Sequence, residues 1–358
     1  MRKCVLRMAL FASIVAWTPV LSGCWDIKDI NHRSLPIVMG VKQVDRAYKV
    51  LLLIPEVSPS EAKAKIVSGS GNTINEILDE INKNMEYKVD LLHLKVIVFE
   101  RSIAEKGLDQ SVESFMRSKD IPNKTFTAIS EGALEPLFEK LEASSGSGGT
   151  EVYDFFEKNA GWSPEVVQTR IWEVFRSMDS YTRDVVIPII KPGRTTTIES
   201  PGGAVIKNGK MVGDINSEES LLYNLFKGSG TQGKIEVMDH ATVKIVSDRL
   251  NTTSEMHAGQ AVLNSRLHLK VTVVETVGTP TEAQIKKEID KQLSMRFNGM
   301  LRSAQAKEAD ILGLGQLFRD EMSRADLQHW RSKYYPFMKI NFKVHVVIQD
   351  EGLLKIDV

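Results

Sequence analysis

The first 24 residues constrain this chain more than any later segment. Residues 1–7 carry three basic side chains and no acid, and an uncharged apolar run from Met8 to Leu21 follows them. The run is too short for a comfortable membrane span, and a cationic start before such a stretch is typical of a secretory leader. We therefore expect residues 1–23 to be a signal peptide and the mature chain to begin at Cys24.

The leader ends in Leu21-Ser22-Gly23-Cys24, which is the lipobox pattern of bacterial lipoproteins. In that pattern the cysteine sulfur receives a diacylglycerol and the chain is cut just before the cysteine. Two acyl chains, each buried CH₂ contributing about 0.8 kcal/mol, anchor a protein stably to a bilayer. The alternative is an ordinary secreted protein with a cysteine near the cleavage site by chance. It fits less well, because all four positions match and the other cysteine, Cys4, lies in the leader.

We therefore predict Cys24 as the lipidation site, an S-diacylglycerol and N-acyl (palmitate) cysteine. Trp25 and Asp26 come directly after it and are candidate membrane or partner contacts, since an aromatic ring suits the headgroup level. The mature chain has no second apolar run of membrane length. We expect no transmembrane helix in it and a body tethered outside the cytoplasm.

Composition narrows the function classes. The 358 residues predict two or three domains. The 46 basic and 46 acidic residues become 43 and 46 once the leader's three basic residues are removed, which argues against nucleic acid as a partner. Two cysteines exclude a disulfide framework and a Cys-rich zinc site.

Hydrophobic patterning predicts an α+β fold: a multi-domain body of mixed or antiparallel sheets flanked by helices, because strands and helices mix without a regular βαβ rhythm. A turn-rich stretch from Pro192 to Gly203 is the best boundary, giving an N-terminal α+β module at 24–195 and a C-terminal α+β module at 203–358.

Local signals predict individual elements. Hairpin turns are expected at Asp45-Arg46 and Asn208-Gly209, and the longest helix from about Pro280 to Ala306. Helix starts are indicated by capping patterns at Thr73/Glu76, Ser102/Glu105, Ser163-Pro164 and Asn216/Glu219.

No motif indicates catalysis, a metal or a cofactor. The glycine-rich stretch from Gly228 to Lys234 resembles a phosphate-binding loop, but a helix precedes it and a strand follows it, which is the reverse of the order that phosphate binding needs. None of the seven histidines has recognisable metal-ligand spacing. Trp330 and Tyr335 lie in an aromatic and basic stretch that we interpret as a helix end packing on the final strand rather than as a binding platform.

Short motifs spread over nearly the whole mature chain resemble the Ger(x)C family, the lipoprotein C subunits of bacterial spore-germination receptors. They are Cys24-Trp25-Asp26-Ile27-Lys28-Asp29-Ile30-Asn31, His93-Leu94-Lys95, Phe115-Met116-Arg117 with Asp120-Ile121-Pro122, Gly203-Ala204-Val205 with Gly213, Glu218, Glu219 and Gly228, and Asp310-Ile311-Leu312-Gly313-Leu314-Gly315 with Trp330. Leu222, where the family often has Gly, and the loop from Ser144 to Gly149 depart from its pattern.

The resemblance implies a non-enzymatic receptor subunit with a body of three α+β domains and no catalytic residues. It would be lipid-anchored on the outer face of the spore inner membrane and work with two integral-membrane subunits that convert nutrient germinants into a response. Two other functions stay open. A solute-binding lipoprotein of a transporter predicts two similar lobes of parallel βαβ repeats. A hydrolase of cell-wall material predicts convergent acids or a metal cluster.

Overall fold

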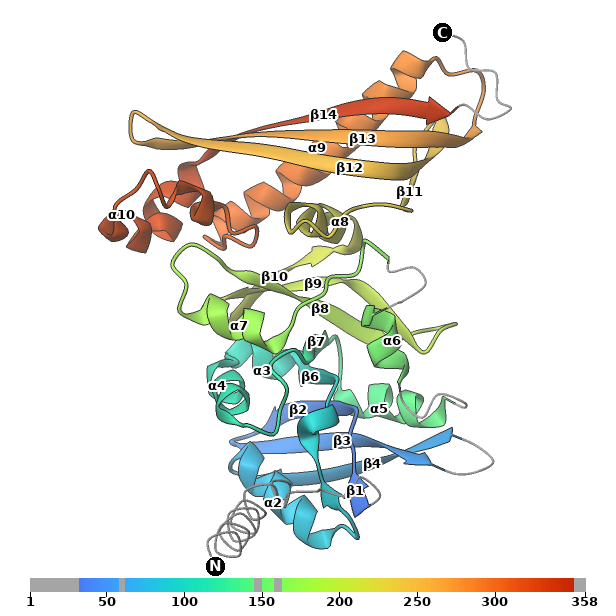
Figure 1. Ribbon diagram of the computed structural model, residues 1–358, viewed down its shortest axis with the longest axis vertical. Helices are drawn as coiled ribbons and strands as arrows, with labels where there is room; N and C mark the ends of the chain where they lie inside the picture. The colour runs from blue at the N-terminus through green and yellow to red at the C-terminus, as the bar shows by residue number, and fades with distance from the viewer. Residues whose placement is uncertain (1–31, 58–61, 145–149, 158–162, 351–358) are drawn as a thin grey trace, which may run out of the picture.

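The structure is a computed structural model that describes residues 32–57, 62–144, 150–157 and 163–350. The described strands form three sheets of eight, four and two strands, and the molecule is elongated (Figure 1). The N-terminal strands lie at one end of the long axis and the four-stranded sheet at the other. None of the helices in these ranges is both long enough and apolar enough to cross a bilayer.

The eight-stranded sheet has the order β10-β9-β8-β7-β6-β2-β3-β4. Its central strands β8, β7, β6 and β2 pair in parallel, and the pairs toward both edges are antiparallel. The strands are β2 (Val38–Val44), β3 (Ala47–Val57), β4 (Ala62–Gly71), β6 (Val96–Glu100), β7 (Phe126–Ser130), β8 (Val185–Pro192), β9 (Ile198–Lys207) and β10 (Lys210–Asn216).

Helices cover both faces of this sheet because its central strands are apolar on both faces. In β6, Val96 and Val98 join one core cluster, while Ile97 and Phe99 join the other. The helices on the Ile97 face are α2 (Ile74–Asn84), α3 (Arg101–Lys106), α4 (Asp109–Arg117) and α7 (Ile171–Met178), and those on the Val96 face are α5 (Leu134–Ala143) and α6 (Glu151–Glu157). A small parallel pair, β1 (Arg33–Ser34) with β5 (Lys88–Val89), is followed by the short helix η3 (Leu91–His93).

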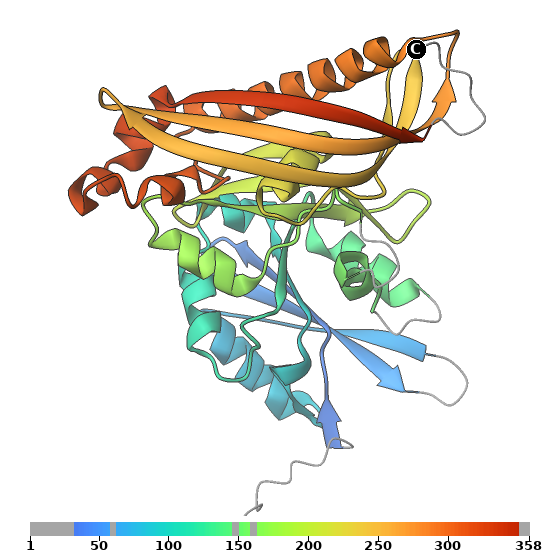
Figure 2. The same cartoon turned by 45° about the horizontal axis from the view of Figure 1, so that its top comes forward.

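The four-stranded sheet has the order β11-β12-β13-β14, and helix α9 covers one face of it (Figure 2). Phe297 of α9 stacks on Phe342 of β14 with ring centroids 4.3 Å apart. The C-terminal elements are α8 (Ser217–Phe226), β11 (Ile235–Val237), β12 (Ala241–His257), β13 (Gln260–Thr276), α9 (Glu282–Ala306), η4 (Leu314–Phe318), α10 (Arg324–Gln328), η5 (Trp330–Tyr334), η6 (Tyr335–Phe337) and β14 (Lys339–Asp350).

The predicted α+β class is confirmed, with mixed sheets flanked by helices. Both hairpin turns form where Asp45 and Asn208 adopt left-handed φ values of 53° and 47°. Helix α9 matches the predicted long helix, and the glycine-rich stretch connects α8 to β11 as expected. Helices α2 and α8 begin at the capping boxes of Thr73 and Asn216.

One predicted helix start has a different capping residue and lies one residue earlier, and another is wrong. Helix α3 begins at Arg101, directly where β6 ends, and the Ser102 hydroxyl donates to the Glu100 carboxylate instead of capping the helix. The residues after Pro164 form no helix until Ile171. The Asn224 amide donates to the carbonyl of Pro164, and the Thr169 hydroxyl donates to the carbonyl of Val186. Tertiary hydrogen bonds therefore hold this segment in a non-helical conformation.

The proposed boundary between the modules at 24–195 and 203–358 falls within one continuous sheet. Strand β9 spans Ile198–Lys207 and pairs with β8 on one side and with β10 on the other. Strands β9 and β10 therefore complete the sheet of the N-terminal module, whereas the four-stranded sheet belongs to the C-terminal module alone, and the division stays a proposal.

Candidate functional site

The predicted anchor lies outside the described residues. Leu21, Ser22, Gly23, Cys24, Trp25 and Asp26 all precede His32, the first described residue, so their roles stay predictions. Chain length still limits where the anchor is. Arg33 of β1 is nine positions after Cys24, and an extended chain spans at most about 3.6 Å per residue. Arg33 therefore lies within roughly 32 Å of Cys24.

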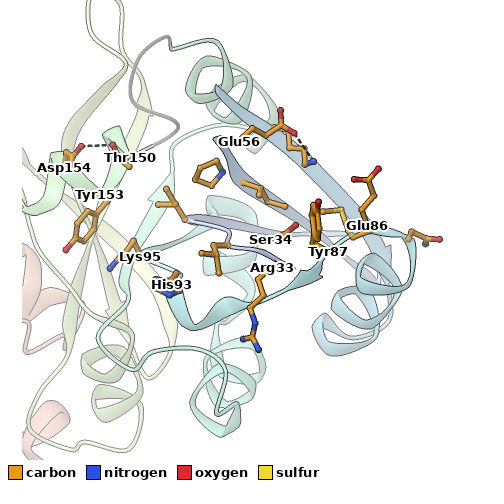
Figure 3. A pocket seen from close by; sticks show the side chains of 17 residues that line it. Arg33, Ser34, Glu56, Glu86, Tyr87, His93, Lys95, Thr150, Tyr153 and Asp154 are labelled. Carbon is orange, nitrogen blue, oxygen red and sulfur yellow. Dashed lines mark hydrogen bonds and ion pairs between the residues drawn. The ribbon is translucent and has the colours of Figure 1, made fainter. Parts of the chain in front are cut away.

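A pocket with a volume of about 1290 Å³ opens beside β1. Figure 3 shows side chains converging on it from β1, β3, the segment after α2, η3 and α6. Its apolar part includes Leu35, Ile37 and Ile54. Its polar part has both signs of charge and two tyrosines, and consists of Arg33, Glu56, Lys65, Glu86, Tyr87, His93, Lys95, Tyr153 and Asp154. We call this cavity the N-terminal pocket.

Ion pairs and backbone bonds fix the walls of the N-terminal pocket. Arg33 pairs with Asp90, whose backbone N–H donates to the carbonyl of Ser34 at 2.9 Å. Burial raises the pKa of Asp90, but the hydrogen bonds from the Leu92 N–H and the Arg33 guanidinium outweigh burial and hold that pKa below its ordinary value. Across the pocket, Lys65 Nζ lies 2.9 Å from Glu56 Oε1.

One wall carries a cation over an aromatic ring. Lys95 Nζ lies 5.1 Å from the centroid of the Tyr153 ring. The Tyr153 hydroxyl hydrogen-bonds Glu157, and this bond together with burial raises the pKa of Tyr153 to about 12. The phenol is therefore neutral at physiological pH. Within the described residues no three His, Cys, Asp or Glu side chains are grouped to hold a metal ion. The arrangement is suited to binding a ligand or segment with polar and apolar parts.

A second buried cluster joins the start of β8 to the segment after α9. It consists of Asp184, Asp310, Trp330 and Arg331, and we call it the polar junction. The Asp310 carboxylate accepts hydrogen bonds of 2.8 Å from the N–H groups of Leu314 and Gly315 and from Trp330 Nε1. Burial raises the pKa of Asp310 to about 6 despite these bonds.

Arg331 balances the second acid of the polar junction. Its Nη2 lies 2.5 Å from Asp184 Oδ1 and its Nε 3.0 Å from Asp184 Oδ2, and the Asp184 side chain is 0% exposed. Asp184 Oδ2 also accepts the Asp310 N–H at 2.8 Å. Burial raises the pKa of Asp184, and Arg331 opposes that change. The junction is thus a structural connection between the two halves of the chain.

Neither site is evident from the sequence, in which His93 and Lys95, and Asp310 and Trp330, stand out only as parts of motifs. The structure places the first two in the wall of the N-terminal pocket and the last two in hydrogen-bond contact. Trp330 and Tyr335 are fully buried, in agreement with the packing interpretation. The acids that complete each site lie far away in sequence, and no local spacing could reveal them.

Family models match the chain in two consecutive segments. The model described as "Spore germination protein N-terminal domain" matches residues 26–192, and "Spore germination B3/GerAC like, C-terminal" matches residues 201–352.

Individual relatives agree with these matches. The chain is 23% identical to spore germination protein GerQC of Bacillus cereus over 288 residues, which cover 76% of this chain and 79% of that protein. It is 21% identical to spore germination protein KC of Bacillus subtilis (strain 168) over 407 residues, which cover 98% and 97%. The crystal structure of the GerBC protein matches with a TM-score of 0.56 and 14% identity over 87% of this chain and 96% of that one, which shows a shared fold. The chain therefore belongs to the Ger(x)C family of spore germination proteins.

Proposed function

We propose that this chain is a lipid-anchored, non-enzymatic subunit of a nutrient-germinant receptor, held on the outer face of the spore inner membrane beside two integral-membrane subunits. The observation that carries the proposal is the order of the sequence. The lipobox ends at Cys24, and the match to a spore germination domain begins two residues later, at Asp26. The leader thus lies directly in front of the family's N-terminal domain.

The anchored end would meet the partner subunits at the N-terminal pocket. A short tether from Cys24 to Arg33 keeps the pocket near the bilayer, where loops of membrane subunits emerge. Confinement to one membrane raises the effective concentration of the partners, so a modest contact area suffices. Trp25 would lie at the headgroup level, with Asp26 turned to water.

Observations in the described part favour a binding role over the two alternatives. The two larger sheets have different strand numbers and orders, whereas a solute-binding lipoprotein would have two similar lobes. The N-terminal pocket also lies within one half of the chain rather than between halves. Two of its cations pair with acids, Arg33 with Asp90 and Lys65 with Glu56, whereas a hydrolase would present convergent acids without such partners.

Replacing Cys24 tests the anchoring. Spores carrying Cys24→Ala should release the protein from the membrane fraction. They should lose the nutrient response and keep responses to receptor-independent triggers. Cys4→Ala is the matched control, because it removes the other cysteine and leaves the lipobox intact. A Cys24→Ala protein that stays membrane-bound in spores that germinate normally would contradict the proposal.

Cross-linking tests the partner contact. Cys24 is the only cysteine of the predicted mature chain, so a single cysteine introduced at Tyr87 can carry a photo-cross-linker at the pocket. We expect cross-links from this position to the membrane subunits in spore membranes. The control position is Met295, which is 57% exposed on α9, the helix that covers the other face of the four-stranded sheet. Equal cross-linking from both positions, or none from Tyr87→Cys, would argue against contact at the N-terminal pocket.

A further inference from the structure

One face of the four-stranded sheet is strongly basic. Figures 1 and 2 show α9 along one face of β12–β14 and no helix over the other. Six exposed cations project from the uncovered face, and we call this set the basic face: Lys244, Arg249, Arg266, Lys270, Lys339 and Lys343. Among the described side chains, two acids share this face, Glu255 and Glu275, and they lie near its opposite ends.

Among the described residues, the cations of the basic face have no acidic partners. No ion pair or hydrogen bond joins any of the six to a carboxylate of the described residues. Elsewhere on the molecule such pairs are common, as between Lys286 and Glu282 on α9. Ordinary protein surfaces mix both signs of charge, so a one-sided patch produces a positive field that attracts anions.

The strand register brings like charges together. Arg266 of β13 lies directly opposite Lys343 of β14. Like charges directly opposite on one sheet face destabilise the pairing. A local arrangement that works against stability is characteristic of a surface used for binding.

Protection of a sheet edge does not explain this pattern. Lysines on an edge strand discourage pairing with other chains, and β14 is an edge strand that carries Lys339 and Lys343. Arg266 and Lys270 belong to β13, which is paired on both sides by β12 and β14. The charge is thus a property of the whole face.

The face fits an extended anionic surface. Its two longest strands have 17 residues each, about 56 Å at 3.3 Å per residue, and the cations are spread over three strands. Three valines project near Lys270 with exposed fractions of 41% (Val246), 52% (Val274) and 42% (Val347). Cations beside exposed apolar side chains suit the boundary between lipid headgroups and acyl chains.

We propose that the basic face binds the surface of a bilayer containing anionic phospholipids. This electrostatic contact acts together with the lipid on Cys24. The inference rests on the proposed function in one respect only, that a bilayer is present.

Vesicle binding tests the proposal without the acyl anchor. The probe is the chain from residue 24 to 358 with Cys24→Ser, which cannot be acylated. It is mixed with vesicles of phosphatidylcholine alone, or of phosphatidylcholine and phosphatidylglycerol at two to one. We expect cosedimentation with the anionic vesicles at low salt, little with the neutral ones, and loss of binding at 0.5 M salt because salt screens the attraction.

Substitutions locate the binding surface. The triple variant Arg266→Gln, Lys270→Gln and Lys343→Gln should bind anionic vesicles about a hundredfold more weakly, since each basic residue near such a surface contributes roughly fivefold. A matched control removes three exposed cations from other elements: Lys106→Gln, Lys119→Gln and Lys210→Gln. It has the same net charge and should bind like the parent chain. Circular dichroism and thermal melting check that both variants fold.

Either of two results would overturn the proposal. One is equal weakening by both triple variants, which would show that net charge and not the basic face decides binding. The other is absence of binding to the anionic vesicles, which would leave an acidic protein as the partner of this face. Because the probe carries no acyl chain, both results are independent of the Cys24→Ala outcome in spores.

Discussion

The polar junction permits a quantitative prediction about how the two halves of the chain are joined. Arg331→Met keeps the length of the side chain but leaves the Asp184 carboxylate buried without its cation. The pair is bidentate, with side chains 0% and 12% exposed. Removing one partner of a buried pair costs about 3–5 kcal/mol, because the remaining charge stays desolvated. We expect the free energy of unfolding in urea to fall by that amount.

A double-mutant cycle separates this charge effect from simple loss of packing. Asp184→Asn removes the charge, and its amide oxygen can still accept the Asp310 N–H. Combined with Arg331→Met, it should cost at least about 2 kcal/mol less than the sum of the single variants. The control is Arg117→Met, which breaks a pair with Glu113 whose arginine is 80% exposed and should cost about 0.5 kcal/mol or less. An Arg331→Met variant within about 1 kcal/mol of the parent, or additive costs in the cycle, would refute the reasoning.

Three further predictions follow from single residues. The pKa of Asp310, about 6 when folded against an ordinary 3.8, means that the folded state holds the proton more tightly. The free energy of unfolding should therefore fall by about 2 kcal/mol between pH 4 and pH 7 through this group. Asp310→Asn should remove that slope in urea titrations, and an unchanged slope would contradict the shift. Gly315→Ala should destabilise by about 1–3 kcal/mol, since its Cβ would lie 2.6 Å from Trp330 Nε1, and a melting temperature equal to the parent's would exclude that clash. Thr73→Ala should cost about 1 kcal/mol by removing the hydroxyl that accepts the Glu76 N–H, whereas Thr73→Ser should retain most of the stability.

The sequence predicts correctly those elements that are determined by residues close together in the chain. The capping box at Thr73 and the turn at Asn208-Gly209 each depend on residues within four positions of one another, so they can be read directly. The helix start predicted at Ser163-Pro164 is wrong because distant groups, the Asn224 amide among them, hold the following segment in a non-helical conformation. Local preference is a weak guide where tertiary hydrogen bonds compete with it.

The order of the strands in the sheets and the composition of both sites could not be predicted from local sequence patterns. Strand β2 lies between β3 and β6, and nothing in its own residues specifies the parallel partner. Asp184 and Arg331 are 147 residues apart, so their pairing appears only in the folded chain. The motif from Asp310 to Gly315 was recognised by resemblance, and the structure supplies its physical reason: the loop surrounds a buried carboxylate with N–H donors. Cys24 is the opposite case, since its assignment comes from sequence alone.

Mass spectrometry of the protein purified from spore membranes tests the central claim most directly. The account predicts that the N-terminal peptide begins at Cys24 and carries the mass of a diacylglycerol, with or without a further N-acyl chain. An intact leader from Met1, or a mature N-terminus with an unmodified Cys24, would contradict it.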